Sequence, residues 1–259
     1  MATVSQFDSD GFIVIKNCLT PREIREWCER LTKSIEQSDS DGRLQAPVAH
    51  KPTTYGIRNL VSICPAVVEL LCLPVIAAKC TEILGKQYGL VRGLYFDKPP
   101  GLSWSLPWHQ DLTIAVAEHR HVANSSLDKQ IDGFSKPTTK AGICHVEAPT
   151  SLLEKMLTVR FHLDAMHGEN GPVVVRKGSH QEGKLLQRQV PIEDEITEIH
   201  CPAGSAMLMR PLLSHSSVAC KPDSHEHRRT IHLELAPTAE LSCGFRWQAY
   251  IPIGERGGQ

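Results

Sequence analysis

The sequence predicts a mainly β fold, a sandwich or jelly roll, with flanking helices near the N-terminus. Short β-branched or alternating segments recur through the second half of the chain, separated by turns rich in Gly, Pro and Asn. Two segments with helical periodicity precede them. We expect one domain over residues 1–259, with a helical part at about 18–86 and a β core at about 88–250.

Composition excludes several classes of partner. The net charge of −1 comes from 28 basic and 29 acidic residues, so neither nucleic acid nor a membrane is an expected partner. No apolar stretch approaches the ~18 residues that span a bilayer, and the first residues do not resemble a signal peptide. The nine cysteines include no Cys-x-x-Cys pair, which argues against a disulfide framework. We expect a cytoplasmic protein with a small-molecule substrate; its oligomeric state is not specified.

The first long helix is expected to follow a short strand over residues 11–15. Thr20 is a candidate N-cap, Pro21 occupies the first helical position and Glu23 lies in the first turn. The residues with helical spacing are Ile24, Trp27, Leu31 and Ile35. Residues 37–54 contain a Ser-Asp run, Gly42 and two prolines, and predict a long loop.

A second helical region is expected over residues 65–84, with Pro74 dividing it and Gly85 ending it. Cys72 and Cys80 fall within it. Small cysteines in an apolar segment are usually buried hydrophobic residues rather than reactive groups. We therefore expect both to lie in the core.

Strands dominate the rest of the chain. We expect one strand over residues 88–96, a turn over 98–101 and a strand that carries His109 and Asp111 and continues past them. The polar residues 118–151 predict a long insertion that covers the strand with His109 and Asp111. The remaining expected strands are 156–164, 172–175, 195–201, 205–209 and 230–235.

The motif Trp108-His109-Gln110-Asp111 is a candidate metal site. Side chains two residues apart point to the same face of a strand, so His109 and Asp111 can bind one ion. His215 is the candidate third ligand, which would complete the set of two histidines and one carboxylate that leaves positions open on Fe(II).

Rival pairs exist. His162 and Asp164 repeat the His-x-Asp spacing, with Arg160 on the same strand face, and spacing alone does not rank this pair below the first. His119 and His121 also have suitable spacing, but no third ligand is suggested nearby, so a solvated loop explains them better.

The last expected strand predicts an anion site. Its residues alternate, which places Arg228, with Thr230 and His232, on one face and Arg229 on the other. An arginine that points into a cavity needs a planar anion, and a carboxylate matches its guanidinium.

Five ordered motifs resemble the phytanoyl-CoA dioxygenase family of Fe(II)/2-oxoglutarate oxygenases, over about residues 10–250. They are YFDKPP at 95–100, PWHQDL at 107–112, ENGP at 169–172 leading to GSH at 178–180, RPLLSHSS at 210–217, and the starting segment DGFIVI at 10–15. The resemblance selects His109 and Asp111 over the rival pair. It implies a double-stranded β-helix, a cupin-like jelly roll, with N-terminal helices packed on its outer face.

The resemblance also implies roles for individual residues. His109, Asp111 and His215 would hold Fe(II), and Arg228 would bind the far carboxylate of 2-oxoglutarate. Arg229 remains the alternative anchor, because the arginine doublet allows a one-residue shift of register. The other co-substrate contacts that the resemblance suggests are Ser217, Arg58 and Arg160, the last at a position where relatives often have tryptophan.

The expected function is therefore that of an oxidoreductase, a dioxygenase that uses Fe(II), 2-oxoglutarate and O2, with ascorbate in support. It would hydroxylate a small molecule and release succinate and CO2. A cupin-like protein that binds metal or a small acid without turnover is the alternative, and a zinc hydrolase is the third choice. Nothing in the sequence specifies a CoA thioester, since it has no phosphate-binding Gly-rich loop and no lysine cluster.

Overall fold

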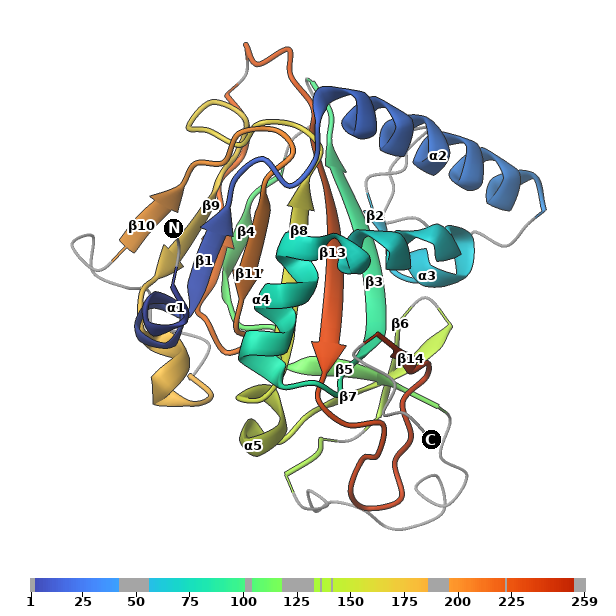
Figure 1. Ribbon diagram of the computed structural model, residues 1–259, viewed down its shortest axis with the longest axis vertical. Helices are drawn as coiled ribbons and strands as arrows, with labels where there is room; N and C mark the ends of the chain where they lie inside the picture. The colour runs from blue at the N-terminus through green and yellow to red at the C-terminus, as the bar shows by residue number, and fades with distance from the viewer. Residues whose placement is uncertain are drawn as a thin grey trace.

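The computed structural model describes residues 3–41, 56–100, 104–117, 133–135, 137–140, 142–185, 196–221 and 223–253. Its centre is a seven-stranded antiparallel sheet in which β2 pairs with β3 and the other strands follow the order β1-β11-β8-β13-β3-β14 (Figure 1). These strands are β1 (Phe12–Ile15), β2 (Gly56–Ile57), β3 (Gly89–Lys98), β8 (Leu157–His162), β11 (Ala206–Met209), β13 (Arg228–Ala236) and β14 (Ile251–Pro252).

A four-stranded sheet packs against one face of the seven-stranded sheet. Its order is β10-β9-β12-β4, with β4 at Leu106–His109, β9 at Val173–Arg176, β10 at Ile196–Ile199 and β12 at His215–Ser217. Buried residues of both sheets share one cluster, including Val173 and Val175 from β9 and Met207 and Met209 from β11. The two sheets together form the layers of a jelly roll, as the sequence predicts.

A third, smaller sheet is formed by strands from the middle of the chain. It has the order β5-β7-β6, with β5 at Thr113–Val116, β6 at Thr138–Lys140 and β7 at Ile143–Glu147. Part of the expected insertion over residues 118–151 is therefore a β-hairpin rather than loop. Gly142, with a φ of +71°, lies at the turn between β6 and β7 and explains how so short a connection is made. His119 and His121 lie outside the described residues.

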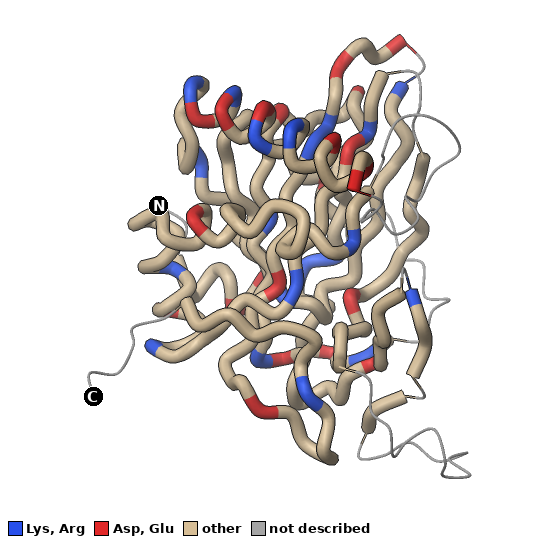
Figure 2. Tube along the Cα trace, turned by 90° about the vertical axis from the view of Figure 1, so that its right-hand side faces the viewer, with Lys and Arg blue, Asp and Glu red and all other residues tan. Residues whose placement is uncertain are grey.

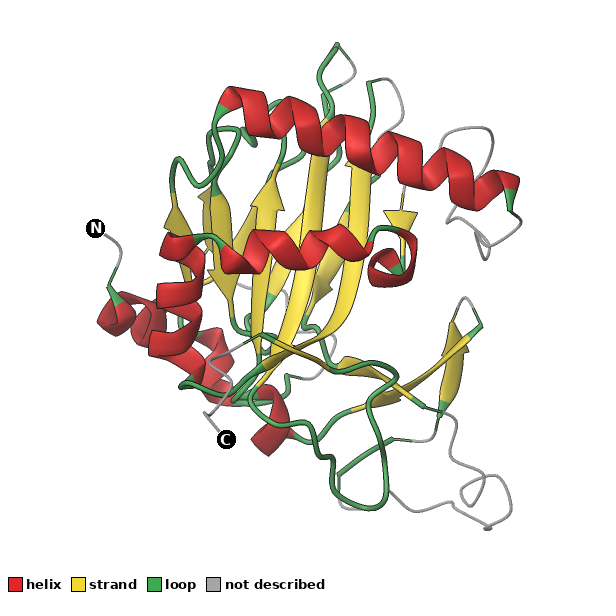
Figure 3. Cartoon of the chain, turned by 45° about the vertical axis from the view of Figure 1, so that its right-hand side comes forward, coloured by secondary structure: helices red, strands yellow, loops and turns green. Residues whose placement is uncertain are grey.

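Helices cover the opposite face of the seven-stranded sheet (Figure 3). Trp27 and Leu31 from α2 share a buried cluster with Ile76 from α4 and with Phe161 and Ile231 from the sheet. The helical elements are α1 (Val4–Asp10), α2 (Pro21–Ser40), α3 (Leu60–Ile63), the 3-10 helix η1 (Pro65–Cys72), α4 (Pro74–Leu84), α5 (Thr150–Leu153) and the 3-10 helix η2 (Ser179–Glu182).

The expected start of α2 is confirmed in detail. Thr20 and Glu23 form a capping box, in which the Thr20 amide donates to Glu23 Oε2 at 2.7 Å and the Glu23 amide donates to Thr20 Oγ1 at 3.3 Å. Acidic and basic residues are interspersed along the helix (Figure 2). Of the described helices, none is long and apolar enough to cross a membrane.

Two helical expectations are wrong. The loop expected over residues 37–54 begins too early, because α2 continues to Ser40, and no helix-breaking residue precedes Gly42. Cys72 is exposed, whereas Cys80 is fully buried as expected. Cys72 ends the 3-10 helix η1, whose three-residue turn presents a different set of side chains to the core than an α-helix does.

The faces of β13 divide the apolar core from a polar interior. Ile231, Leu233 and Leu235 belong to the cluster beneath the helices. Arg228, Thr230 and His232 alternate with them and are also buried, so they point between the two large sheets. The fold therefore places polar side chains inside the jelly roll, where a site requires them.

We expect Thr20→Ala to lower the free energy of unfolding by about 1 kcal/mol, because the first turn of α2 loses its side-chain cap. Chemical denaturation measures the change. Thr32→Ala, at an exposed position inside the same helix, is the matched control and should not lower stability, because Ala has a higher helix propensity than Thr. Equal losses in both variants would show that the capping box contributes nothing specific.

Candidate metal centre

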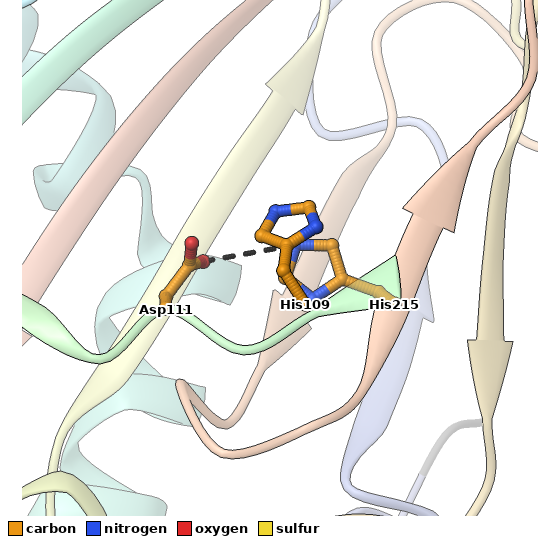
Figure 4. Close-up of side chains that lie close together, drawn as sticks. All are labelled: His109, Asp111 and His215. Atoms are coloured by element: carbon orange, nitrogen blue, oxygen red, sulfur yellow. Dashed lines mark ion pairs between the residues drawn. The ribbon is translucent and has the colours of Figure 1, made fainter. Parts of the chain in front are cut away.

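Strand pairing brings the two candidate histidine ligands together. His109 ends β4, His215 begins β12, and the two residues are Cα partners in the antiparallel pair. Their ring centroids lie 4.2 Å apart (Figure 4). Residues far apart in the chain thus present two imidazoles to one point.

Backbone carbonyls orient both imidazoles. His109 Nδ1 lies 2.8 Å from Pro107 O, and His215 Nδ1 lies 2.9 Å from Leu213 O. A carbonyl can only accept, so each Nδ1 carries the proton and each Nε2 retains a lone pair for a metal. This is the arrangement in which an outer hydrogen bond sets the tautomer of a metal-binding histidine.

Asp111 reaches the same point from a break between two strands. We expected one continuous strand, but β4 ends at His109 and β5 begins at Thr113 in a different sheet. The Gln110 side chain holds the break, since its Nε2 donates to Gly183 O at 2.8 Å and to Leu212 O at 2.6 Å. The Asp111 amide donates to Pro211 O at 2.9 Å.

The three side chains have the geometry of a ligand set. One ligand atom from each of His109, Asp111 and His215 lies within 4.8 Å of the others (Figure 4). Asp111 Oδ2 is buried and accepts no hydrogen bond, and the Nε2 atoms of His215 and His232 lie 3.9 and 4.0 Å from it. An orphaned carboxylate oxygen between imidazole nitrogens fits a divalent cation such as Fe(II).

Local charge favours the metal-binding protonation states. Burial raises the pKa of Asp111, but the neighbouring His215, His232 and His109 outweigh it and lower that pKa below its usual range. Burial lowers the pKa of His215 to about 4, against the opposing effect of Asp111. At neutral pH the site therefore offers a carboxylate and a neutral imidazole, as metal coordination requires.

A cluster of buried cations lines the pocket next to these ligands. Lys98, Arg160 and Arg228 are only 1%, 7% and 2% exposed. The pocket holds about 60 Å³, and its lining is Phe96, Lys98, Trp104, Leu106, His109, Asp111, Arg160, Val173, His215, Ser216, Ser217, Arg228 and His232. Asp111 is the one carboxylate in this lining against three buried cations, so the pocket favours an anionic ligand.

The two arginines of this cluster have hydrogen-bond donors without acceptors within the protein. The Nε atoms of Arg160 and Arg228 are buried without a hydrogen-bond partner, and Arg228 Nη1 lies 3.7 Å from Met166 Sδ. Burial, followed by the charge of Arg160, lowers the pKa of Arg228 to about 9. Burial, followed by the charge of Arg228, lowers the pKa of Lys98 to about 7.

Lys98 is a site residue that the sequence analysis missed. Its Nζ donates to Ser217 Oγ at 3.1 Å and to Val218 O at 2.8 Å. Lys98 is also the Cα partner of Arg228 on the neighbouring strand. If the strand expected over residues 88–96 had been extended by two residues, its alternation would have placed Lys98 on the inner face. We assigned Lys98 to a turn instead, because two prolines follow it.

The two arginines of the doublet lie in different surroundings. Arg228 lines the pocket, whereas Arg229 pairs with Asp164 through Nε at 2.8 Å and Nη2 at 2.7 Å. This pairing also accounts for the rival His-x-Asp motif. Asp164 binds Arg229 instead of sharing a site with His162, so our expectation that it lies on the same face as Arg160 and His162 is wrong.

The other expected residues are distributed between two pockets. Ser217, which accepts from Lys98, lines the metal pocket. Arg58 does not; it lines a separate pocket beside α3. His162 is fully buried, both of its ring nitrogens lack partners, and burial together with Arg160 holds its pKa well below the usual value.

Solved structures of other proteins share this fold. The chain is similar to the apo form of the non-heme monooxygenase ThoJ, with 16% identity over 98% of this chain and 84% of that chain, at a TM-score of 0.66. It is similar to EctD from S. alaskensis with bound Fe, with 16% identity over 90% of this chain and 74% of that chain, at a TM-score of 0.65.

A third similar structure is HygX from Streptomyces hygroscopicus with nickel and 2-oxoglutarate bound, at 16% identity, 92% and 88% coverage and a TM-score of 0.59. None of the curated protein sequences matches the chain. The model of the phytanoyl-CoA dioxygenase family matches residues 7–131 and 132–229, which is most of the chain. The chain therefore belongs to the phytanoyl-CoA dioxygenase family.

Proposed function

We propose that the chain is a dioxygenase that uses Fe(II), 2-oxoglutarate and O2 to hydroxylate a small molecule. One observation carries the proposal. A set of two histidines and one carboxylate shares a pocket with buried cations, and Asp111 is the only carboxylate among the residues that line this pocket. Bound Fe(II) and 2-oxoglutarate would supply the oxidising chemistry, with release of succinate and CO2 and with ascorbate in support.

His109, Asp111 and His215 would hold the metal on one side. Three protein ligands leave the remaining positions of an octahedron open, which suits a chelating keto acid and dioxygen. The Nδ1 hydrogen bonds to backbone carbonyls fix the orientation of both imidazoles. The protein therefore contributes a preorganised set of ligands.

Arg228, Lys98 and Arg160 would bind the co-substrate on the other side. A dianion such as 2-oxoglutarate neutralises two positive charges and gives the orphaned guanidinium Nε atoms an acceptor. We place its far carboxylate at Arg228, because this arginine lines the pocket beside Lys98 and its buried Nε has no hydrogen-bond partner. The HygX structure, which holds nickel and 2-oxoglutarate, supports this class of ligand in this fold.

We expect the wild-type protein to form succinate from 2-oxoglutarate when Fe(II), ascorbate and a suitable metabolite are present. His109→Ala, Asp111→Ala and His215→Ala should each abolish this and weaken Fe(II) binding, because two ligands cannot hold the facial set. His162→Ala is the matched control and should bind metal nearly normally. A protein that binds Fe(II) and 2-oxoglutarate but forms no succinate with any of a broad metabolite panel would be a binding protein.

Arg228→Ala should weaken 2-oxoglutarate binding by about 30-fold to several thousand-fold, since a sheltered charge-assisted pair is worth about 2 to 5 kcal/mol. Arg229→Ala should leave that affinity near normal and lower stability instead, because its partner is Asp164. Anaerobic calorimetry with Ni(II) in place of iron gives both affinities. A large defect in Arg229→Ala alone would move the anchor by one residue.

We expect the affinity for 2-oxoglutarate to depend on pH through Lys98. Its pKa of about 7 in the free site should rise when the dianion binds, so the bound form retains a proton that the free form loses. The affinity for 2-oxoglutarate should then fall as pH rises from 7 to 8.5, by up to about tenfold per pH unit. Lys98→Met should remove this slope, whereas Lys33→Met on exposed α2 should retain it; an unchanged slope in Lys98→Met would assign it to another group.

A further inference from the structure

A second pocket, of about 370 Å³, lies at the side of the seven-stranded sheet next to α3 and the start of β7. Its polar lining includes Arg58, Asn59, Arg92 and Gln248. Pockets that hold small organic molecules start at about 300 Å³. The pocket at the metal ligands, at about 60 Å³, is much smaller and is already assigned to the metal and co-substrate.

The floor of the second pocket is a gap along the edge of β3. On this edge β2 pairs with Tyr95 and Phe96, and β14 pairs with Gly89 and Leu90. Among the described residues, no strand covers the edge of β3 between these two pairings. Gly93 lies in the gap, and a Cβ there would come within 2.8 Å of Val61, so the glycine lets α3 pack close to the sheet.

The charge around this pocket is positive. Arg92 is 10% exposed, its Nη1 lies 3.3 Å from both Thr113 O and Glu234 Oε1, and its buried Nε has no partner. Arg58 is half-buried and has no acidic partner among the described residues. Burial, followed by the charge of Arg92, lowers the pKa of the Arg58 guanidinium.

A third cation lies close by. Burial, and then the charges of Arg58 and Arg92, lower the pKa of the Lys140 ammonium, so the three groups share one positive region. Glu234 is the acidic side chain bound to this region, and it also lies 3.6 Å from His232 Nε2. Solvent alone does not explain Arg92, because its side chain is nearly buried and still has a free donor.

Side-chain contacts connect this pocket to the metal centre. Arg92 holds Glu234, Glu234 approaches His232, and His232 Nε2 lies 4.0 Å from Asp111 Oδ2. A row of three side chains, Arg92, Glu234 and His232, thus runs from the lining of the second pocket to Asp111, away from Arg228 along β13. The two pockets share no lining residue, so a molecule seated in the second pocket need not displace 2-oxoglutarate.

We propose that the second pocket binds the substrate through an oxyanion, a carboxylate or a phosphate ester, which Arg58 and Arg92 hold while the rest of the molecule extends toward the metal. This inference rests on the proposed function and names the class of its substrate. Two guanidinium groups with free donors and little opposing charge match an oxyanion.

The test uses the full chain with Ni(II) and saturating 2-oxoglutarate, without oxygen, so that the first pocket is filled. Butyl phosphate and pentanoate, which carry the two oxyanions on similar alkyl chains, are titrated by ligand-observed NMR. We expect at least one to bind, and Arg58→Gln to weaken it about tenfold or more through loss of a charge-assisted hydrogen bond. Tighter butyl phosphate assigns a phosphate ester, and tighter pentanoate assigns a carboxylic acid.

Two further variants test whether the loss of anion binding is specific to the guanidinium groups of the second pocket. Arg25→Gln, at an exposed position of α2, removes the same charge from the chain and should leave the anion affinity unchanged. Arg92→Lys keeps a positive charge beside Glu234 but loses the guanidinium fork, so it should also weaken anion binding. Circular dichroism checks that each variant is folded.

The outcomes separate this inference from the proposed function. If 2-oxoglutarate does not bind the wild-type protein with Ni(II), the proposed function fails. If it binds and neither anion does, only the inference is overturned. The inference also fails if Arg58→Gln weakens 2-oxoglutarate instead of the anion, because Arg58 would then belong to the co-substrate site.

Discussion

The antiparallel pairing of β4 with β12 is the constraint on which the candidate site depends. It sets His109 opposite His215, and the carbonyls of Pro107 and Leu213 fix the orientation of both rings. A shift of one residue in either strand would turn an imidazole to the other face of the sheet. The placement of the two histidine ligands is therefore a property of sheet register, whereas Asp111 is placed by the break after β4.

The second constraint is the burial of like charges. Taking a charged side chain out of water costs several kcal/mol, and the metal pocket contains three buried cations, Lys98, Arg160 and Arg228. The Nε atoms of both arginines have no acceptor within the protein. The apolar cluster beneath the helices must offset this cost in the free protein. Binding of a dianion would recover part of it, which makes ligand binding and stability linked quantities.

Features of the fold that depend on local sequence patterns were predicted correctly. Alternation along β13 placed Arg228 and His232 on the inner face, and the capping box fixed the start of α2. The break after His109 was missed because its cause, the bonds of Gln110 to Gly183 and Leu212, is tertiary and leaves no local signal. The pairing of Arg229 with Asp164 was missed for the same reason.

The row Arg92, Glu234, His232 and Asp111 explains how one strand can serve two pockets. Arg228, His232 and Glu234 all lie on the inner face of β13. This face therefore runs from the co-substrate anchor at Arg228 to Glu234, which binds Arg92 in the lining of the second pocket. An anion at Arg92 would compete with Glu234 for the guanidinium and so alter the charge that His232 experiences. Because His232 lies beside Asp111, occupancy of the second pocket would be felt at the metal ligand through electrostatics alone.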